Sequence, residues 1–235
     1  MKKSYLAVSL AVIFCFMAAV GLCVRALFGA EAVSAFDEGG MRIVVDAGHG
    51  GIDGGVVGRE TGVKESDLNL SIAYRLQDVL TDMGFEVTMT RKTEAGLYDA
   101  ATKGFKKRDM QKRREIITAA DPALVISVHQ NFYPSKKSRG AQVFYNDKTE
   151  GGALFAGAVQ AQLNDLYAEK GVKGRKITAG EFYVLECVDR PSIIVECGFL
   201  SSPLDEELLR SEQWQEKLAQ SIGAGVVAYL AGNAT

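Results

Sequence analysis

Only two histidines occur in this chain of 235 residues, and each follows a short apolar run. His49 stands in the segment DAGHGG, and His129 comes directly after the run LVISV. Such runs are typical of buried strands, and in open α/β sheets ligands bind beyond the carboxyl ends of the strands. Neutral imidazole is a good zinc ligand, and a catalytic zinc needs three protein ligands and an open position. The two histidines therefore indicate a metal site, although each could instead cap its own strand through local hydrogen bonds.

A third ligand has to be a carboxylate or a cysteine, and Glu65 is the best candidate. It precedes a predicted helix and follows a long glycine-rich loop, residues 50–62, that could wrap back toward His49. Glu65 could equally be an exposed carboxylate that the helix dipole favours in the first turn. Spacing alone does not decide, because four other acidic residues compete for this role: Asp46, Asp53, Glu60 and Asp67.

Glu196 is the candidate for acid–base chemistry. It follows the apolar run SIIV and precedes the segment CGFL. A carboxylate at the end of a buried strand is costly unless it is paired or functional. Partial burial raises the pKa of a carboxyl toward the range of a general base. The alternative is a plain salt bridge with an arginine such as Arg113.

The elements that must position these residues alternate between short strands and longer helices. Ser66 is the expected N-cap of the first helix, and residues 91–105 are expected to form a surface loop. Close strand–helix–strand spacing predicts a single α/β domain with a mainly parallel sheet of about six strands, flanked by helices. The expected strands are 42–46, 85–90, 124–128, 141–146, 182–185 and 193–195. The expected helices are 66–83, 108–120, 152–167 and 211–230.

The amino-terminal segment predicts export. Lys2 and Lys3 precede an uncharged stretch, residues 5–24, that is long enough to span a bilayer. We expect a cleaved signal peptide or a membrane anchor at 1–35, a linker at 36–40 and a catalytic domain at 41–235. The domain would then lie outside the cytoplasmic membrane, either secreted or membrane-anchored. Membrane contact is expected only through this segment.

Charge and cysteine content exclude some other classes of protein. The net charge of -2 does not favour nucleic acid as a partner. Basic residues gather within 103–114, which indicates either a solvated helix face or contact with an anionic wall polymer. The domain holds only Cys187 and Cys197, too few for a disulfide framework. We expect two buried thiols, although an exported protein could form one bond between them.

Several segments together resemble the zinc-dependent N-acetylmuramoyl-L-alanine amidases often called amidase family 3. They are, in order, VVDAGHGGIDGG, VKESDLNLSIAYRL, GFEVTMTR, KRREII, ISVHQN, GAQVFY and PSIIVECGFLSS. The resemblance covers the chain from Met41 onward and implies a single α/β domain. It implies one Zn²⁺ bound by His49, Glu65 and His129, with Glu196 as the catalytic carboxylate. Its implied substrate is peptidoglycan, cut between N-acetylmuramic acid and the L-alanine of the stem peptide.

The segments 97–108 and 132–145 are more narrowly similar to germination-specific amidases, which act in spore-cortex synthesis before a muramic lactam forms. The resemblance implies that the exported domain faces the cell wall, with the forespore intermembrane space as one such place. Asn131 and Arg113 are candidates for hydrogen bonds to substrate or to the ligands. In the implied reaction, Glu196 takes a proton from water and passes it to the leaving amine. The alternatives are a vegetative autolysin of the same family, a zinc peptidase cutting within the stem peptide, and a non-catalytic wall-binding module. The sequence leaves open whether an accessory protein activates the enzyme.

Overall fold

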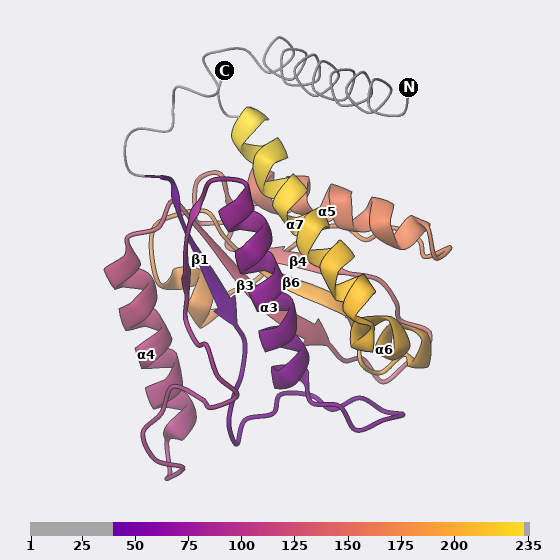
Figure 1. Ribbon diagram of the computed structural model, residues 1–235, viewed down its shortest axis with the longest axis horizontal. Coiled ribbons are helices and arrows are strands. Elements are labelled where there is room, and N and C mark those ends of the chain that lie inside the picture. The colour runs from indigo at the N-terminus through magenta and orange to yellow at the C-terminus, as the bar shows by residue number, and fades with distance from the viewer. Residues whose placement is uncertain (1–39, 233–235) are drawn as a thin grey trace, which may run out of the picture. The chain divides into compact units, whose positions relative to one another are not determined.

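The computed structural model describes residues 40–232, which form one α/β unit (Figure 1). The expected signal or anchor at 1–35 and nearly all of the expected linker lie outside the described residues. Among the described helices, none combines the length and the apolar character that crossing a membrane requires.

A six-stranded sheet forms the centre of the fold, in the order β2-β1-β3-β6-β4-β5. Its strands are β1 (Arg42–Ala47), β2 (Glu86–Met89), β3 (Leu124–Asn131), β4 (Gln142–Tyr145), β5 (Thr178–Ala179) and β6 (Ser192–Phe199). The strands β2, β1, β3 and β6 are mutually parallel, while β4 pairs antiparallel with β6 and parallel with β5. The prediction of a mainly parallel sheet of about six strands is confirmed.

Helices cover both faces of this sheet. They are α3 (Glu65–Asp82), α4 (Phe105–Ala120), α5 (Gly152–Ala168), α6 (Pro203–Arg210) and α7 (Glu212–Gly232). Successive strand residues point to opposite faces, so Ile43 and Val45 enter the larger apolar core, beneath α3, α5 and α7. Val44 enters a smaller core with Ile117 of α4. In Figure 1, α4 lies apart from the group formed by α3, α5 and α7.

Two local predictions are wrong. Ser66 is not the N-cap of α3, because the chain enters the helix earlier, with Lys64 as N-cap, and the Ser66 hydroxyl donates to Asp67 instead. The segment 182–185 is not a strand but runs into a short 3-10 helix, η1 (Tyr183–Glu186). Both sides of β6 are already paired, with β3 and β4, so this apolar run packs over the smaller core instead.

Other boundaries differ more modestly. The helix α4 begins at Phe105 rather than at residue 108, which shortens the preceding loop. Neither β5 nor α6 was among the elements predicted from the sequence. In α6, the Ser202 side chain caps the helix by accepting from the amide of Asp205, directly before Pro203. Cys187 and Cys197 are both buried free thiols, as expected.

Candidate metal centre

The candidate residues gather at the edge of the sheet where β1, β3 and β6 end. His49 lies two residues beyond β1, and His129 lies near the end of β3. Glu196 on β6 is paired in register with His129. Parallel strands place their carboxyl ends together, so three segments that are far apart in the sequence meet at this edge.

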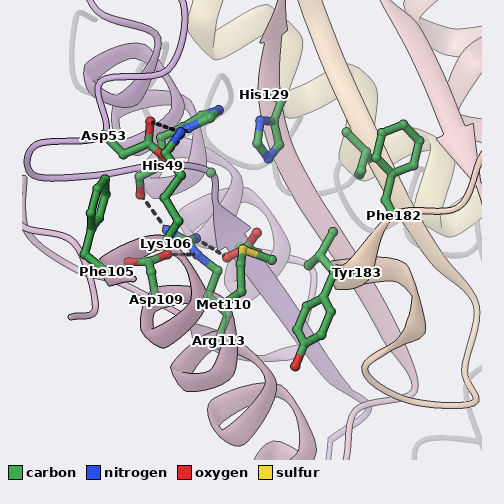
Figure 2. Close-up of a pocket in the computed structure, with 14 residues that line it drawn as sticks. His49, Asp53, Phe105, Lys106, Asp109, Met110, Arg113, His129, Phe182 and Tyr183 are labelled. Carbon is green, nitrogen blue, oxygen red and sulfur yellow. Dashed lines mark hydrogen bonds and ion pairs between the residues drawn. The ribbon is translucent and has the colours of Figure 1, made fainter. Parts of the chain in front are cut away.

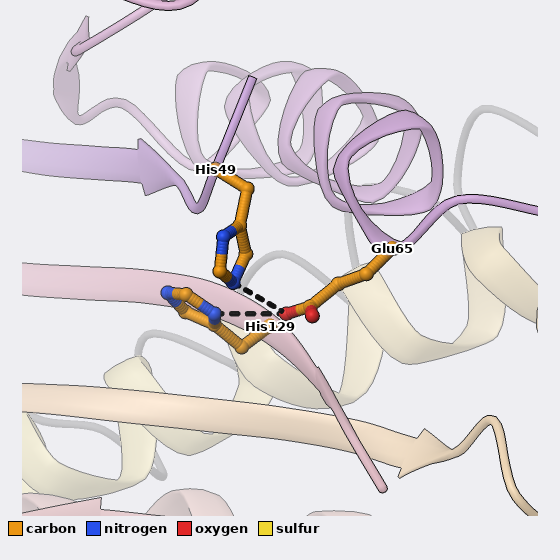
Figure 3. Close-up of side chains that lie close together, drawn as sticks. All are labelled: His49, Glu65 and His129. Atoms are coloured by element: carbon orange, nitrogen blue, oxygen red, sulfur yellow. Dashed lines mark hydrogen bonds and ion pairs between the residues drawn. The ribbon is translucent and has the colours of Figure 1, made fainter. Parts of the chain in front are cut away.

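Glu65 reaches this edge from the first turn of α3, and one of its carboxylate oxygens faces both imidazoles (Figure 3). Its Oε1 lies 2.9 Å from Nδ1 of His129 and 3.3 Å from Nε2 of His49. One donor atom from each of the three residues lies within 4.8 Å of the others. Two imidazole nitrogens and one carboxylate oxygen are a ligand set typical of catalytic zinc, so the residues present fit this metal.

The Glu65 carboxylate is fixed on both of its oxygens. Oε2 accepts from the amide of Val56, while Oε1 accepts from the amide of Gln130 and the side chain of Asn69. Burial alone would raise the pKa of Glu65, but the two histidines lower it well below its usual range. Glu65 therefore stays an anion, the form that binds a cation.

The loop that carries His49 is held by buried arginine contacts. His49 has a φ of 60°, an uncommon value for a residue other than glycine. Arg113 donates to the carbonyls of Ala47 and His49 and pairs with Asp46 at 2.5 Å and with Asp109 at 2.7 Å. Arg113 thus supports the backbone of a candidate ligand.

Glu196 differs from Glu65 in its surroundings. Among the described residues nothing hydrogen-bonds to its buried Oε2. The alternative of a salt bridge with Arg113 is not observed, because that arginine forms its ion pairs with Asp46 and Asp109. Burial raises the pKa of Glu196 to about 7. Two carboxylates whose pKa values are shifted in opposite directions suit different roles, a ligand and a proton acceptor.

The competing acidic residues have other partners. Asp46 pairs with Arg113, Glu60 with Lys136, and Asp67 accepts from Ser66. Asp53 is close to the centre, but its carboxylate lies on the far nitrogen of a ligand candidate, with Oδ2 3.2 Å from Nδ1 of His49. A carboxylate in that place orients a metal-binding imidazole.

Asn131, the remaining candidate, is the last residue of β3 and lies two positions beyond His129. Its backbone carbonyl accepts from the amide of Leu200, and its half-buried side chain has no hydrogen-bond partner within residues 40–232. The structure therefore does not bring Asn131 into the network that holds Glu65.

Two residues that hydrogen-bond to Glu65, Asn69 and Gln130, were missed. Asn69 lies one helical turn after Glu65, is fully buried, and accepts from the side chain of Gln130. Its i+4 spacing from Glu65 was the available signal. At Gly48, an added Cβ would lie 2.7 Å from Nδ1 of His129 and closer still to two other ring atoms. Glycine here lets the backbone approach the imidazole closely.

A cavity of about 290 Å³ opens beside the two histidines. Figure 2 shows it between α4, which contributes Lys106 and Met110, and the segment that carries Phe182 and Tyr183. Lys106 lies 3.3 Å from Asp53 at this cavity. The candidate metal centre is therefore open on one side to a mixed apolar and charged space, as an open coordination position requires.

Residues 43–228 match the N-acetylmuramoyl-L-alanine amidase family. The chain is 36% identical over 193 residues to a germination-specific N-acetylmuramoyl-L-alanine amidase of Bacillus subtilis strain 168, covering 81% of this chain and 80% of that one. It resembles the structure of the CwlD amidase from Clostridioides difficile in complex with the GerS lipoprotein. That match has a TM-score of 0.78 and 30% identity, over 82% of this chain and all of the other. The catalytic domain of the amidase CwlV from Bacillus (Paenibacillus) polymyxa gives a TM-score of 0.70 at 27% identity, over 81% and 98% of the two chains.

Proposed function

This chain belongs to the N-acetylmuramoyl-L-alanine amidase family, and on that premise we propose how its residues perform the reaction and where the enzyme acts. The enzyme hydrolyses the amide bond between N-acetylmuramic acid and the L-alanine of the stem peptide. One observation carries the proposal for the site. Two imidazoles and an anionic carboxylate converge at the sheet edge, beside a carboxyl group whose pKa burial raises to about 7.

His49, Glu65 and His129 would hold one Zn²⁺, because Nε2 of His49 and Nδ1 of His129 both face Oε1 of Glu65. A bound zinc ion supplies Lewis acidity that polarises the scissile carbonyl and acidifies water. The protein keeps the three donors in place beforehand. Asn69 and the Gln130 amide orient Glu65, and Asp53 holds the His49 ring through its other nitrogen.

Glu196 is proposed as the general base and then the general acid. Its buried Oε2 has no protein partner among the described residues, so it is free to accept a proton from the attacking water. The same carboxyl then delivers that proton to the nitrogen of L-alanine as the amide bond breaks. A pKa of about 7 suits both transfers, because the group gains and loses a proton readily near neutral pH.

The cellular role is proposed to be cortex synthesis in a spore-forming bacterium, where removal of the stem peptide precedes muramic-lactam formation. The likeness to a germination-specific amidase supports this role. The neighbouring amidase in complex with a lipoprotein supports an accessory protein partner for this chain as well. Export through the segment 1–35, as a signal or an anchor, is part of the same proposal.

The test is mass spectrometry of purified cortex-type and vegetative peptidoglycan after incubation with the enzyme and zinc. Released peptides that begin with L-alanine are expected from the wild type, and Glu196→Gln should release almost none while keeping its zinc. The matched control is Glu207→Gln, an exposed glutamate on α6. Full activity of Glu196→Gln would remove this residue from the mechanism.

The same spectra separate the alternatives. New amino termini inside the stem peptide would indicate a zinc peptidase instead of an amidase. Equal release from vegetative wall and from cortex would favour an autolysin. A wild type that binds wall but releases nothing, with zinc present, would favour a binding module. Metal analysis of His49→Ala completes the test, because unchanged zinc content would exclude His49 as a ligand.

A further inference from the structure

A second pocket, of about 400 Å³, is lined by basic side chains and lies outside the metal centre. Its lining consists of Lys137, Arg139, Gly171, Val172, Lys173, Gly174 and Arg175. Four of these seven residues are cationic and none is acidic. In a protein with a net charge of -2, this is a local concentration of positive charge that the composition does not reveal. We call it the basic pocket.

The two arginines of the basic pocket are anchored through one nitrogen each. Nε of Arg139 donates to the fully buried Asp205 at 2.9 Å. Nε of Arg175 donates to the carbonyl of Arg139 at 2.8 Å, and its guanidinium stacks 4.4 Å from the centre of the Phe199 ring. The terminal nitrogens of both side chains have no hydrogen-bond partner within residues 40–232. Each arginine is therefore held in place by Nε, while its two terminal nitrogens stay available to bind an anion through a pair of hydrogen bonds.

The two lysines add charge that no acidic side chain neutralises. Within the described residues neither Lys137 nor Lys173 forms a salt bridge, whereas the adjacent Lys136 pairs with Glu60 at 3.3 Å. Asp205 balances only Arg139. The basic pocket thus keeps about three uncompensated positive charges, a number that follows from these pairings. A carboxylate or phosphate is the ligand chemistry that such a site takes.

The topology places the basic pocket at the same edge of the sheet as the metal centre. Because β4 is antiparallel to β6, it begins where β6 ends, and Gln142 at its start is paired with Glu196. Arg139 precedes Gln142 by three residues. Strand spacing and chain geometry put the basic pocket on the order of 15 Å from His129, since neighbouring strands lie about 4.8 Å apart and each residue adds at most about 3.5 Å.

That separation matches the length of a short peptide, because four extended residues span up to about 14 Å. We propose that the basic pocket binds a carboxylate of the stem peptide while the first amide of that peptide lies at the metal centre. This inference rests on the proposed function and adds a substrate-recognition site to it. Peptides with free carboxylates would then be preferred over amidated ones.

The first experiment measures binding without turnover. The full chain, in neutral detergent and stripped of metal, is titrated by calorimetry with a tetrapeptide that begins with L-alanine and carries free carboxylates. The same peptide with its carboxylates amidated, and inorganic phosphate, are the other probes. The variant Lys137→Gln/Lys173→Gln removes two exposed charges without touching either arginine anchor. The matched control is Lys92→Gln/Lys107→Gln, which removes two exposed lysines elsewhere.

Wild type and control are expected to bind the free-carboxylate peptide equally, and the basic-pocket variant about tenfold more weakly, the typical effect of losing charge-assisted hydrogen bonds. Arg175→Lys keeps the charge but loses the planar fork, so it should bind several-fold more weakly. The amidated peptide should bind weakly to every form. Three results would each overturn the proposal. They are equal peptide binding by the wild type and the basic-pocket variant, equal binding of the free and amidated peptides, and a wild type that binds phosphate but not the peptide.

Kinetics on the metal-loaded enzyme form the second experiment. With muropeptides that carry free carboxylates, the basic-pocket variant should raise KM about tenfold at unchanged kcat. With amidated muropeptides it should match the wild type, and a KM rise of equal size there would overturn the proposal. If wild-type enzyme cleaves neither muropeptide, the proposed function fails, while the calorimetry still decides whether the basic pocket binds carboxylates.

Discussion

Replacing Gly48 with alanine should displace a metal ligand without unfolding the protein. The added methyl group would lie 2.7 Å from Nδ1 of His129 and closer to Cε1 and Nε2 of the same ring. Ordinary van der Waals contact begins at about 3.4 Å, so Nδ1 has to move by about 0.7 Å and the two nearer ring atoms by more. Metal–ligand distances tolerate only about 0.2 Å. Zinc affinity should therefore fall by at least the ten- to hundredfold that lesser ligand disturbances cause.

The assay is zinc content by mass spectrometry after dialysis against a zinc buffer, beside thermal unfolding of the metal-free proteins. Gly157→Ala is the matched control, because a methyl group at that position in α5 meets nothing within 4 Å. We expect this control to keep its zinc and its activity. A Gly48→Ala protein with wild-type zinc content and wild-type activity would refute the reasoning about close backbone approach.

Three further predictions concern charge. Burial would raise the pKa of Asp46, but Arg113 and two hydroxyl groups outweigh it and lower the pKa to about 2. The ion pair of Asp46 with Arg113 should therefore contribute about 2 kcal/mol to the free energy of unfolding above pH 4, and this contribution is lost as the pH falls toward 2. An Asp46 pKa above 4, measured by carboxyl NMR titration, would contradict this. Asp53→Asn should weaken zinc binding about tenfold or more by loosening the His49 ring, as competition with a chelator measures. The value of kcat/KM should fall as the pH is lowered and Glu196 becomes protonated. The midpoint should lie at or below about pH 7, because burial raises the pKa of Glu196 to about 7 and a bound cation would lower it. A flat acidic limb would argue against Glu196 as the base.

The opposite behaviour of the two glutamates explains why the roles cannot be exchanged. Glu65 accepts hydrogen bonds on both oxygens and faces two imidazoles, so it stays ionised and immobile. Glu196 lies one strand away from His129 and lacks such donors on Oε2. Immobility suits a ligand, whereas a proton carrier needs a group whose charged and neutral forms have similar free energies.

The sequence by itself determined the features that depend on local pattern. Apolar runs predicted β1, β3 and β6, because a buried strand needs consecutive apolar residues. The two histidines and Glu196 were identified because each polar residue interrupts or ends such a run. The parallel arrangement followed from the short connections between strands and helices, which leave few alternative topologies.

Only the tertiary structure decided which acidic residue joins the histidines. Four other carboxylates were compatible with the spacing, and the choice depends on the path of the loop 50–62. Glu206 on α6 holds that loop by accepting from the amides of Glu60 and Thr61, which lie about 145 positions away in the chain. With the loop held in this way, the amide of Val56 donates a hydrogen bond to Glu65 and fixes its carboxylate beside the histidines.

The same limit applies to Arg113 and to the basic pocket. The sequence could not show that Arg113 pairs with Asp46, 67 residues away, rather than with Glu196. Nor could it show that Arg139 and Arg175 meet, because their contact depends on β4 and β5 lying side by side. Periodicity reports which residues are buried within an element, whereas the partner of a buried polar group is set by the packing of distant elements.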